Sequence, residues 1–298
     1  MPDAPLPDDS LRAALHGVRG LLLDLDGVLI AAGTAVPGAP EAMAELERRG
    51  FPYLVVTNTS LVSRSTLSAW GGRLGFATPA NRFQSALSAS AELVRREFAD
   101  RPVYVITADD ARAEFAGLRV LNAAEVDADP TGVAAVILGD SPDELTKANL
   151  DRAFRLVRGG AELIGMHRNA WWVTPDGPRL DAGAFLVGLE YATGRPARIV
   201  GKPAASFFGV AARRLSAEAV ARGQRPIRHR DLAMVGDDVT SDIRGGRRAG
   251  LRTVFVRSGK HGDAELAAAA ARTRGAAQPD AIAPSVVEVV EAVLASSG

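Results

Sequence analysis

Short apolar runs, each followed by polar residues and separated by helix-like segments, are the feature that most limits how this chain can fold. The runs at 20–25 (GLLLDL) and 52–57 (PYLVVT) are almost wholly apolar, and similar runs lie at 198–201, 232–236 and 252–256. Continuous apolar runs are typical of parallel strands that are buried on both faces. The alternation predicts an α/β fold whose parallel sheet is covered by helices and binds ligands at the carboxyl ends of its strands.

Helix signals occupy the gaps between these runs. Pro37 opens a helix that Gly50 ends, and Ser63 is placed to cap a second helix that runs to about Leu74. A last helix is expected over 284–295, where Pro284 supplies the first turn. These helices would cover the faces of the sheet.

The middle of the chain has the pattern of a second α/β unit. Three further strands are expected at 103–107, 134–138 and 162–166. The sequence Ser141-Pro142-Asp143-Glu144 matches a capping box and predicts a helix that runs from there to about Val157. We therefore expect a discontinuous core domain, residues 1–78 and 179–298, with an α/β domain inserted at 79–178.

Composition excludes several classes of protein. The 298 residues are 47% hydrophobic, which is typical of folded domains, and 35 acidic residues balance 35 basic ones, so no basic excess points to nucleic acid. The chain has no Cys, which excludes disulfides and thiolate metal sites. No apolar run is long enough for a membrane span, and the acidic, proline-rich start differs from a signal peptide. We expect a cytoplasmic protein with no membrane partner.

The first polar motif is Asp24-Leu25-Asp26-Gly27, at the end of the first apolar run. Two acids at a strand end are unfavourable unless a cation or hydrogen-bond donors stabilise them. A period of two would point both side chains the same way, so that one carboxylate attacks while the other exchanges protons. A simple Asp-Gly turn is the alternative for this motif alone.

Two further motifs suit phosphate. Thr57 and Asn58 follow the second run and offer a hydroxyl and an amide, although such a pair is also common in turns. Lys202 precedes Pro203, which suits the first position of a helix, and a cation at a helix start favours a bound anion. Lysine is rare here, because only three of the 35 basic residues are Lys, so Lys202 suggests a need for a compact charge.

The fourth motif holds three carboxylates within six residues after an apolar run: Asp237, Asp238 and Asp242. Such a group suits a hard cation with oxygen ligands, and an acidic helix start is the alternative. The four motifs together are far more specific than any one of them, because each would lie at a strand's carboxyl end.

In this order the motifs resemble those of the haloacid dehalogenase (HAD) superfamily. Thr57 and Lys202 are about 145 residues apart, which fits the NagD-like class (class IIA), whose large α/β cap is inserted after the second motif. The segments 167–208 and 235–260 look most like that class. The members it resembles most carry Ser where this chain has Asp26, so their substrates are not carried over.

The resemblance implies a Rossmann-like core with an inserted cap and a Mg²⁺-dependent phosphatase that works through an aspartyl-phosphate. It makes Asp24 the nucleophile and Asp26 the general acid and base. Mg²⁺ would be bound by Asp24, the carbonyl of Asp26, and Asp237. Thr57, Asn58 and Lys202 would bind the phosphoryl group. Asp238 and Asp242 would act behind these ligands, in roles that the sequence does not separate.

Substrate choice is expected to lie in the cap, just after its predicted strand at 162–166. His167, Arg168, Asn169, Trp171 and Trp172 fall there; Arg168 would bind a second anion and a Trp would stack on a ring. Alternatively, both Trp are cap core and Arg168 is solvated. The sequence leaves open the small phosphorylated substrate and a homodimer.

Two rival functions are weighed against phosphatase. A carbon–halogen hydrolase of the same superfamily is disfavoured, because those enzymes need no Mg²⁺ and lack an acid at the Asp26 position. A non-catalytic phosphate-binding or partner-binding protein with the HAD fold is the remaining alternative.

Overall fold

The computed structural model describes residues 9–174, 177–273 and 275–296, which form two compact units. The first unit contains the chain up to Thr57, residues 67–84 and everything from Lys202 onward, and the second contains residues 58–66 and 85–201. Residues 1–8, which entered the prediction that the chain lacks a leader, lie outside the described part of the chain.

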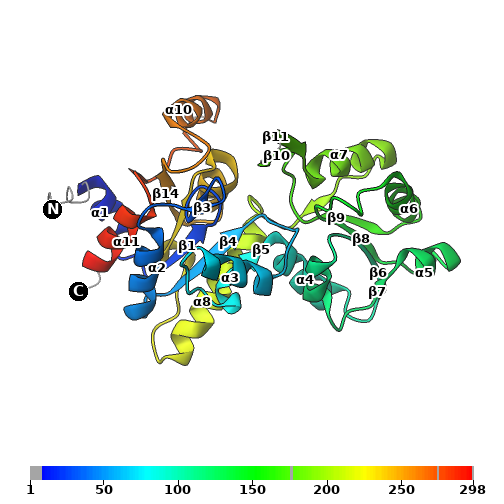
Figure 1. Ribbon diagram of the computed structural model, residues 1–298, viewed down its shortest axis with the longest axis horizontal. Coiled ribbons are helices and arrows are strands. Elements are labelled where there is room, and N and C mark those ends of the chain that lie inside the picture. Colours follow the sequence, from blue (N-terminus) through cyan, green and yellow to red (C-terminus); the bar gives the residue numbers. More distant parts are fainter. Residues whose placement is uncertain (1–8, 175–176, 274, 297–298) are drawn as a thin grey trace. The chain divides into compact units, whose positions relative to one another are not determined.

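The first unit is built on a six-stranded sheet in the order β15-β14-β13-β1-β4-β5 (Figure 1). Its strands are β1 Gly20–Asp24, β4 Tyr53–Thr57, β5 Phe83–Ser85, β13 Leu232–Gly236, β14 Arg252–Val256 and β15 Ala281–Ala283. The pairs that β1 makes with β13 and β4 are parallel, as are the pairs β13–β14 and β14–β15. The α/β class with a parallel core sheet, predicted from the apolar runs, is confirmed.

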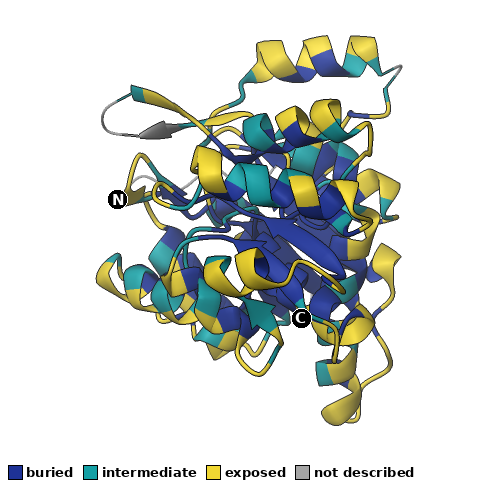
Figure 2. Ribbon diagram, turned by 90° about the vertical axis from the view of Figure 1, so that its right-hand side faces the viewer, coloured by how far each residue is buried: buried dark blue, intermediate teal, exposed yellow. Residues whose placement is uncertain are grey.

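Seven helices and one small hairpin accompany this sheet in the described chain. The helices are α1 Asp9–Leu15, α2 Ala39–Arg48, α3 Arg64–Arg73, α8 Ala205–Ala221, α9 Gly245–Arg248, α10 Asp263–Arg272 and α11 Val286–Ala295, and the hairpin is β2 Ile30–Ala31 with β3 Thr34–Ala35. Every residue of β1, β4 and β13 is buried, whereas the helices turn exposed faces outward (Figure 2). Burial on both faces explains why these strands are continuous apolar runs.

The second unit has its own five-stranded parallel sheet, in the order β12-β9-β8-β6-β7. Its strands are β6 Val103–Ile106, β7 Val120–Leu121, β8 Ala135–Leu138, β9 Glu162–Gly165 and β12 Arg198–Ile199, with a hairpin of β10 Trp171–Thr174 and β11 Gly177–Leu180. Its helices are α4 Ala86–Glu97, α5 Ala123–Ala128, α6 Lys147–Arg158 and α7 Ala182–Thr193. A separate inserted α/β unit is thus present, as predicted.

The unit boundaries differ from the predicted insertion at 79–178. The strand expected at 198–201 is β12, and it pairs with β9 of the second unit rather than with the core sheet. Helix α7 belongs to the same unit, because its buried Ala182, Leu186 and Leu189 join the hydrophobic cluster of that unit. Residues 58–66 also belong to it, through contacts described below. Burial in the second core therefore holds these segments there, which local sequence patterns do not reveal.

Helix α2 begins at Ala39 and α11 at Val286, each two residues after the proline predicted to open it. Two other predicted helix starts differ more. Helix α8 begins at Ala205, after a cis peptide bond between Lys202 and Pro203, so Pro203 is not in its first turn. Helix α6 begins at Lys147 with Thr146 as its cap, and the predicted capping box at 141–144 forms only a turn. The reason is that the Glu144 side chain accepts a hydrogen bond from Asn149 instead of completing the box.

Replacing Thr146 by Ala is expected to lower the free energy of unfolding of the second unit by about 1 kcal/mol. The Thr146 hydroxyl accepts the Asn149 N–H at 3.2 Å, and loss of a helix cap typically costs this much. Urea denaturation followed by circular dichroism measures the change. Thr146→Ser keeps the hydroxyl and should stay near wild type; equal stability of the Ala variant would show that the cap contributes nothing.

Candidate active site

A buried ammonium group between two carboxylates lies at the centre of the site. The Nζ atom of Lys202 is 2.6 Å from Asp24 Oδ1 and 2.8 Å from Asp242 Oδ1. It also donates to the carbonyl of Val56 at 3.3 Å. All three charged residues are buried. Charged groups are buried only when they are paired, so these three side chains depend on one another.

The core sheet brings these residues together at the carboxyl ends of its central strands. Asp24 is the last residue of β1, and the parallel register places Leu23 beside Val235 of β13. Strand β13 then ends at Gly236, so that Asp237 follows directly. On the other side Asp24 lies opposite Val56 of β4, next to Thr57. The predicted convergence of the first, second and fourth motifs is therefore explained by parallel pairing.

Asp237 is held in a tight space. Its Oδ2 accepts the backbone N–H of Lys260 at 2.7 Å. A side chain at Gly27 would place its Cβ 2.4 Å from that oxygen, and one at Gly259 would place it 2.1 Å away. Gly27 also has φ 79°, a conformation that favours glycine. Both glycines are thus required for the Asp237 carboxylate to occupy this position.

The structure separates Asp238 from Asp242, which the sequence did not. Asp242 contacts Lys202 through Oδ1, and its Oδ2 accepts the Asp238 N–H at 3.2 Å. Asp238 instead caps the short helical segment Val239–Arg244, accepting from the N–H groups of Thr240 and Ser241. Its Oδ2 lies 2.7 Å from Lys260 Nζ. Asp242 therefore orients Lys202, whereas Asp238 orders the chain after β13.

Asp24, Asp237 and Asp242, here called the acid cluster, are the described residues whose carboxylate oxygens could jointly hold a metal ion, within 4.8 Å of one another. Burial raises the pKa of Asp24 and Asp237 to about 6 each, and that of Asp242 to about 7; neighbouring carboxylates add to each shift. Burial opposes the charge on Lys202, yet Asp24 and Asp242 raise its pKa. One ammonium does not balance three carboxylates, so the oxygen donors fit a hard divalent cation.

Asp26 is arranged differently from the prediction. Strand β1 ends at Asp24, so Asp26 does not share its face through the pleat of a strand; it lies in the following turn and bridges to Ile30. Its side chain is open to solvent, unlike that of Asp24. Crowding by protein atoms nonetheless reduces its hydration and raises its pKa, and Asp237 adds to this shift. An acid of this kind is suited to exchanging protons.

The second and third motifs lie at the first and last of the four points where the chain passes between units. Thr57 is buried at the end of β4, and Asn58 is the first residue of the second unit. Gly201 is the last residue of that unit, and Lys202 follows it. A Cβ at Gly201 would lie 2.7 Å from Asn58 Oδ1, so the two crossing segments touch. Thr57 and Lys202 therefore belong to the first unit and Asn58 to the second.

His167 is a buried anchor in the second unit. It is 2% exposed, and its Nε2 lies 2.9 Å from Ser60 Oγ. Ser60 also accepts the Asp140 N–H at 2.8 Å, and its carbonyl accepts from Thr107 Oγ1. Burial lowers the pKa of His167 to about 4, which keeps the ring neutral. These contacts explain why residues 58–66 belong to this unit.

The other predicted cap residues lie on its surface. Arg168 forms an ion pair with Glu190, with Nη1 2.9 Å from Oε1. Asn169 is exposed, and its N–H points to His167 Nδ1 at 3.4 Å. Trp171 is 60% exposed, so the alternative that both Trp are cap core is wrong for this residue. Trp172 is half-buried, and its Nε1 has no hydrogen-bond partner among the described residues.

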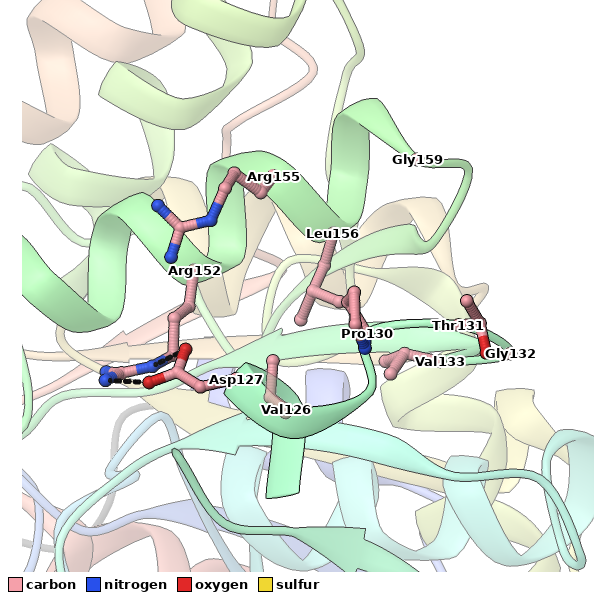
Figure 3. A pocket seen from close by; sticks show the side chains of 10 residues that line it. All are labelled: Val126, Asp127, Pro130, Thr131, Gly132, Val133, Arg152, Arg155, Leu156 and Gly159. Carbon is pink, nitrogen blue, oxygen red and sulfur yellow. Dashed lines mark hydrogen bonds and ion pairs between the residues drawn. The ribbon is translucent and has the colours of Figure 1, made fainter. Parts of the chain in front are cut away.

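A pocket of about 490 Å³ in the second unit lies elsewhere, between α5 and α6 (Figure 3). Val126, Val133 and Leu156 form its apolar lining. The Arg152 guanidinium in its wall is paired with Asp127 at 2.7 Å. None of the predicted site residues lines it, so it is separate from the chemistry inferred above.

Comparison with known proteins gives the family. Residues 21–120 match the haloacid dehalogenase-like hydrolase family, and residues 199–289 match a second, HAD-hydrolase-like family. The chain belongs to the haloacid dehalogenase-like hydrolases. Within them it is a NagD-like, class IIA member, as its inserted cap indicates.

Two human proteins are among its curated relatives. Haloacid dehalogenase-like hydrolase domain-containing protein 2 is 32% identical over 249 residues, covering 84% of this chain and 88% of that protein. Phospholysine phosphohistidine inorganic pyrophosphate phosphatase is 31% identical over 252 residues, with coverage of 83% and 85%.

Solved structures share the fold. A p-nitrophenyl phosphatase from Archaeoglobus fulgidus has a TM-score of 0.78 at 24% identity, covering 92% of this chain and 99% of that one. NagD from E. coli K-12 has a TM-score of 0.77 at 24% identity, with coverage of 91% and 98%. A glycerol phosphate phosphatase from Mycobacterium tuberculosis, in complex with magnesium, has a TM-score of 0.77 at 24% identity, with coverage of 93% and 77%.

Lys260 is the residue of the site that sequence reasoning missed. Its backbone holds Asp237 and its side chain holds Asp238. The sequence could have indicated this residue, because Lys260 is one of only three lysines in the chain. Separately, no helix in the described part of the chain is long and apolar enough to cross a membrane.

Lys202→Arg should reduce kcat by at least tenfold although it keeps the charge. The Lys202 ammonium contacts Asp24, Asp242 and the Val56 carbonyl in a fully buried space, and a planar guanidinium fork presents its donors differently. Steady-state kinetics with p-nitrophenyl phosphate measure the effect.

The exposed Lys147 provides a matched control for this variant. Lys147→Arg, on α6, should behave as wild type. Retention of most of the kcat by Lys202→Arg would show that only a general positive charge is needed at that position.

Proposed function

We propose that this protein is a Mg²⁺-dependent phosphatase that hydrolyses a small phosphorylated compound through an aspartyl-phosphate on Asp24. The observation that carries the proposal is the Lys202 ammonium held between Asp24 and Asp242 at the carboxyl ends of β1 and β13. A carboxylate beside a fixed cation is arranged to approach an anionic phosphoryl group that it would otherwise repel. The phosphatases among its relatives support this reading.

The first step transfers the phosphoryl group to the protein. An oxygen of Asp24 attacks phosphorus, the bond from phosphorus to the leaving oxygen breaks, and Asp26 gives its proton to that oxygen. The raised pKa of Asp26 supports this role, since a general acid must hold a proton near neutral pH. Lys202 and the Thr57 hydroxyl, with the backbone of Asn58, bind the phosphoryl oxygens, whose charge grows in the transition state.

The second step releases phosphate. Water attacks phosphorus, the bond to Asp24 breaks, and Asp26, now ionised, accepts the proton of the water. Atoms and charges balance over the two steps, and the enzyme returns to its starting state. The solvent-exposed position of Asp26 supports this assignment, because the same carboxyl must meet both the leaving group and water.

Mg²⁺ would be held by Asp24, Asp237 and the backbone carbonyl of Asp26. When bound, it supplies charge stabilisation for the phosphoryl oxygens. The oxygen-only donor set fits this ion, and a structural relative was solved in complex with magnesium. Lys202, oriented by Asp242, supplies the second positive charge from the chain itself.

The inserted unit, which we propose as the cap, would select the substrate. All proposed chemical groups except the Asn58 backbone lie in the first unit, which leaves discrimination to surface residues of the second. Arg168, Trp171 and Trp172 are the candidates. Phosphomonoesters such as nitrophenyl and glycerol phosphates, and pyrophosphate, are the substrates named for relatives and the first to screen.

A phosphatase assay tests the proposal directly. The protein should hydrolyse p-nitrophenyl phosphate with Mg²⁺ and lose nearly all activity in excess EDTA, and Asp24→Asn should be inactive with Mg²⁺. An amide is a very poor nucleophile, so the expected loss in kcat is at least a thousandfold. Phosphate release measures each rate.

The controls separate catalysis from folding. Asp143→Asn changes an exposed carboxylate and should keep wild-type rates. The circular dichroism spectrum of Asp24→Asn should match the wild type. Equal rates in EDTA and Mg²⁺ would reject the metal assignment, and phosphate binding without turnover of any substrate would favour the non-catalytic alternative.

Trp171→Ala should lower kcat/KM for the best natural-type substrate by about tenfold while changing p-nitrophenyl phosphate hydrolysis much less. Trp171 is exposed, so its removal leaves the fold intact, and a small generic ester makes few contacts with the cap. Tyr191→Ala, which removes another exposed aromatic ring of the same unit, is the control and should change neither rate. Equal losses on both substrates would assign Trp171 to another role.

A further inference from the structure

The segment Ser258–His261, here called the Lys260 loop, follows β14 and is fastened to two motifs of the site. Ser258 Oγ donates to the Gly27 carbonyl at 2.6 Å. The Lys260 N–H donates to Asp237 Oδ2, and the His261 ring accepts the Val239 N–H at 3.2 Å. These bonds use the backbone of Lys260 and the side chains of its neighbours. The loop is therefore held in place without the Lys260 side chain.

The Lys260 side chain has a different environment from that of Lys202. Its Nζ lies 2.7 Å from Asp238 Oδ2, and its side chain is 61% exposed, against 2% for Lys202. Its charge lowers the pKa of Asp26 and Asp237 against the effect of burial. Lys260 thus places a solvent-exposed cation beside Asp238, near enough to Asp237 of the acid cluster to lower its pKa.

Carboxylates outnumber ammonium groups in the site, even when Lys260 is counted. Five carboxylates lie in the site: those of the acid cluster together with Asp26 and Asp238. Lys202 and Lys260 are the ammonium groups that contact them in the described structure. Excess negative charge attracts a divalent cation but repels a phosphate dianion. Each cation beside the carboxylates weakens the first effect and strengthens phosphate binding.

We propose that Lys260 sets the balance between metal affinity and phosphate affinity in this site, weakening the first in order to strengthen the second. The inference rests on the proposed function, because it takes Mg²⁺ and phosphate as the ligands. Removal of its charge should change the two affinities in opposite directions. Loss of a merely structural contact would weaken both or neither, so the opposite signs identify an electrostatic role.

The test uses Lys260→Met, which keeps the length of the side chain and removes its charge. Calorimetric titration of Mg²⁺ into the metal-free protein should give a dissociation constant roughly threefold to tenfold lower than wild type, from Coulomb interactions at such distances. The dissociation constant of inorganic phosphate for the Mg²⁺-loaded protein should rise by a similar factor. Both changes should shrink at high salt, since Lys260 is exposed to solvent.

Two variants serve as controls, and a third replaces Lys260→Met if that variant does not fold. Lys260→Arg keeps the charge and should restore both constants to near wild type. Lys147→Met removes an exposed lysine that is paired with Asp151 on α6, and should change neither. If Lys260→Met does not fold, Lys260→Gln removes the same charge and is measured in its place.

Changes of the same sign, or no change in either constant, would overturn the inference while leaving the proposed function standing. A wild-type protein that binds neither Mg²⁺ nor phosphate would overturn both. Opposite changes that Lys260→Arg reverses support it, whatever the turnover number of the protein.

Discussion

The contact of Lys202 with Asp24 and Asp242 is the interaction on which the rest of the site depends. Burying charged groups is unfavourable, and a buried pair from which one partner is removed leaves an uncompensated charge. The acid cluster contains more negative than positive charge even with Lys202 present. Such a cluster stabilises the fold poorly by itself, and the cation and anion of the proposed function would explain its residues better.

The chain first leaves and last rejoins the first unit at residues that the proposed mechanism uses. It first leaves that unit between Thr57 and Asn58 and makes its last return between Gly201 and Lys202. Ser60 and His167 fasten the departing segment to the second unit, whereas Asp24 and Asp242 fasten Lys202 to the first. The predicted insertion at 79–178 began about twenty residues too late and ended about twenty residues too early, because the contacts that assign these segments are tertiary and no local sequence pattern records them.

Much of the core site was predictable because local patterns of apolar and polar residues in the sequence indicate it. Buried parallel strands are continuous apolar runs, and the polar residue that follows such a run lies at the carboxyl end, so Asp24, Thr57 and Asp237 were placed correctly from sequence. Lys202 was predicted to follow a core strand and to stand at a helix start, and the structure differs on both points. It follows β12 of the second unit rather than a core strand, and its charge faces carboxylates rather than a helix start.

Lysine is rare in this chain, and the positions of its lysines indicate more of the site than the four motifs do. The contacts of Lys202 include Asp24, Asp242 and the Val56 carbonyl, which lie around one nitrogen and suit the hydrogens of an ammonium group. A guanidinium has a fixed planar fork and does not point to three acceptors around one atom. Lys260 is not under this constraint, since its exposed head contacts one carboxylate. In a chain that otherwise uses arginine, two of the three lysines therefore lie among the carboxylates of the site, and only at Lys202 does the contact geometry itself explain the choice of lysine.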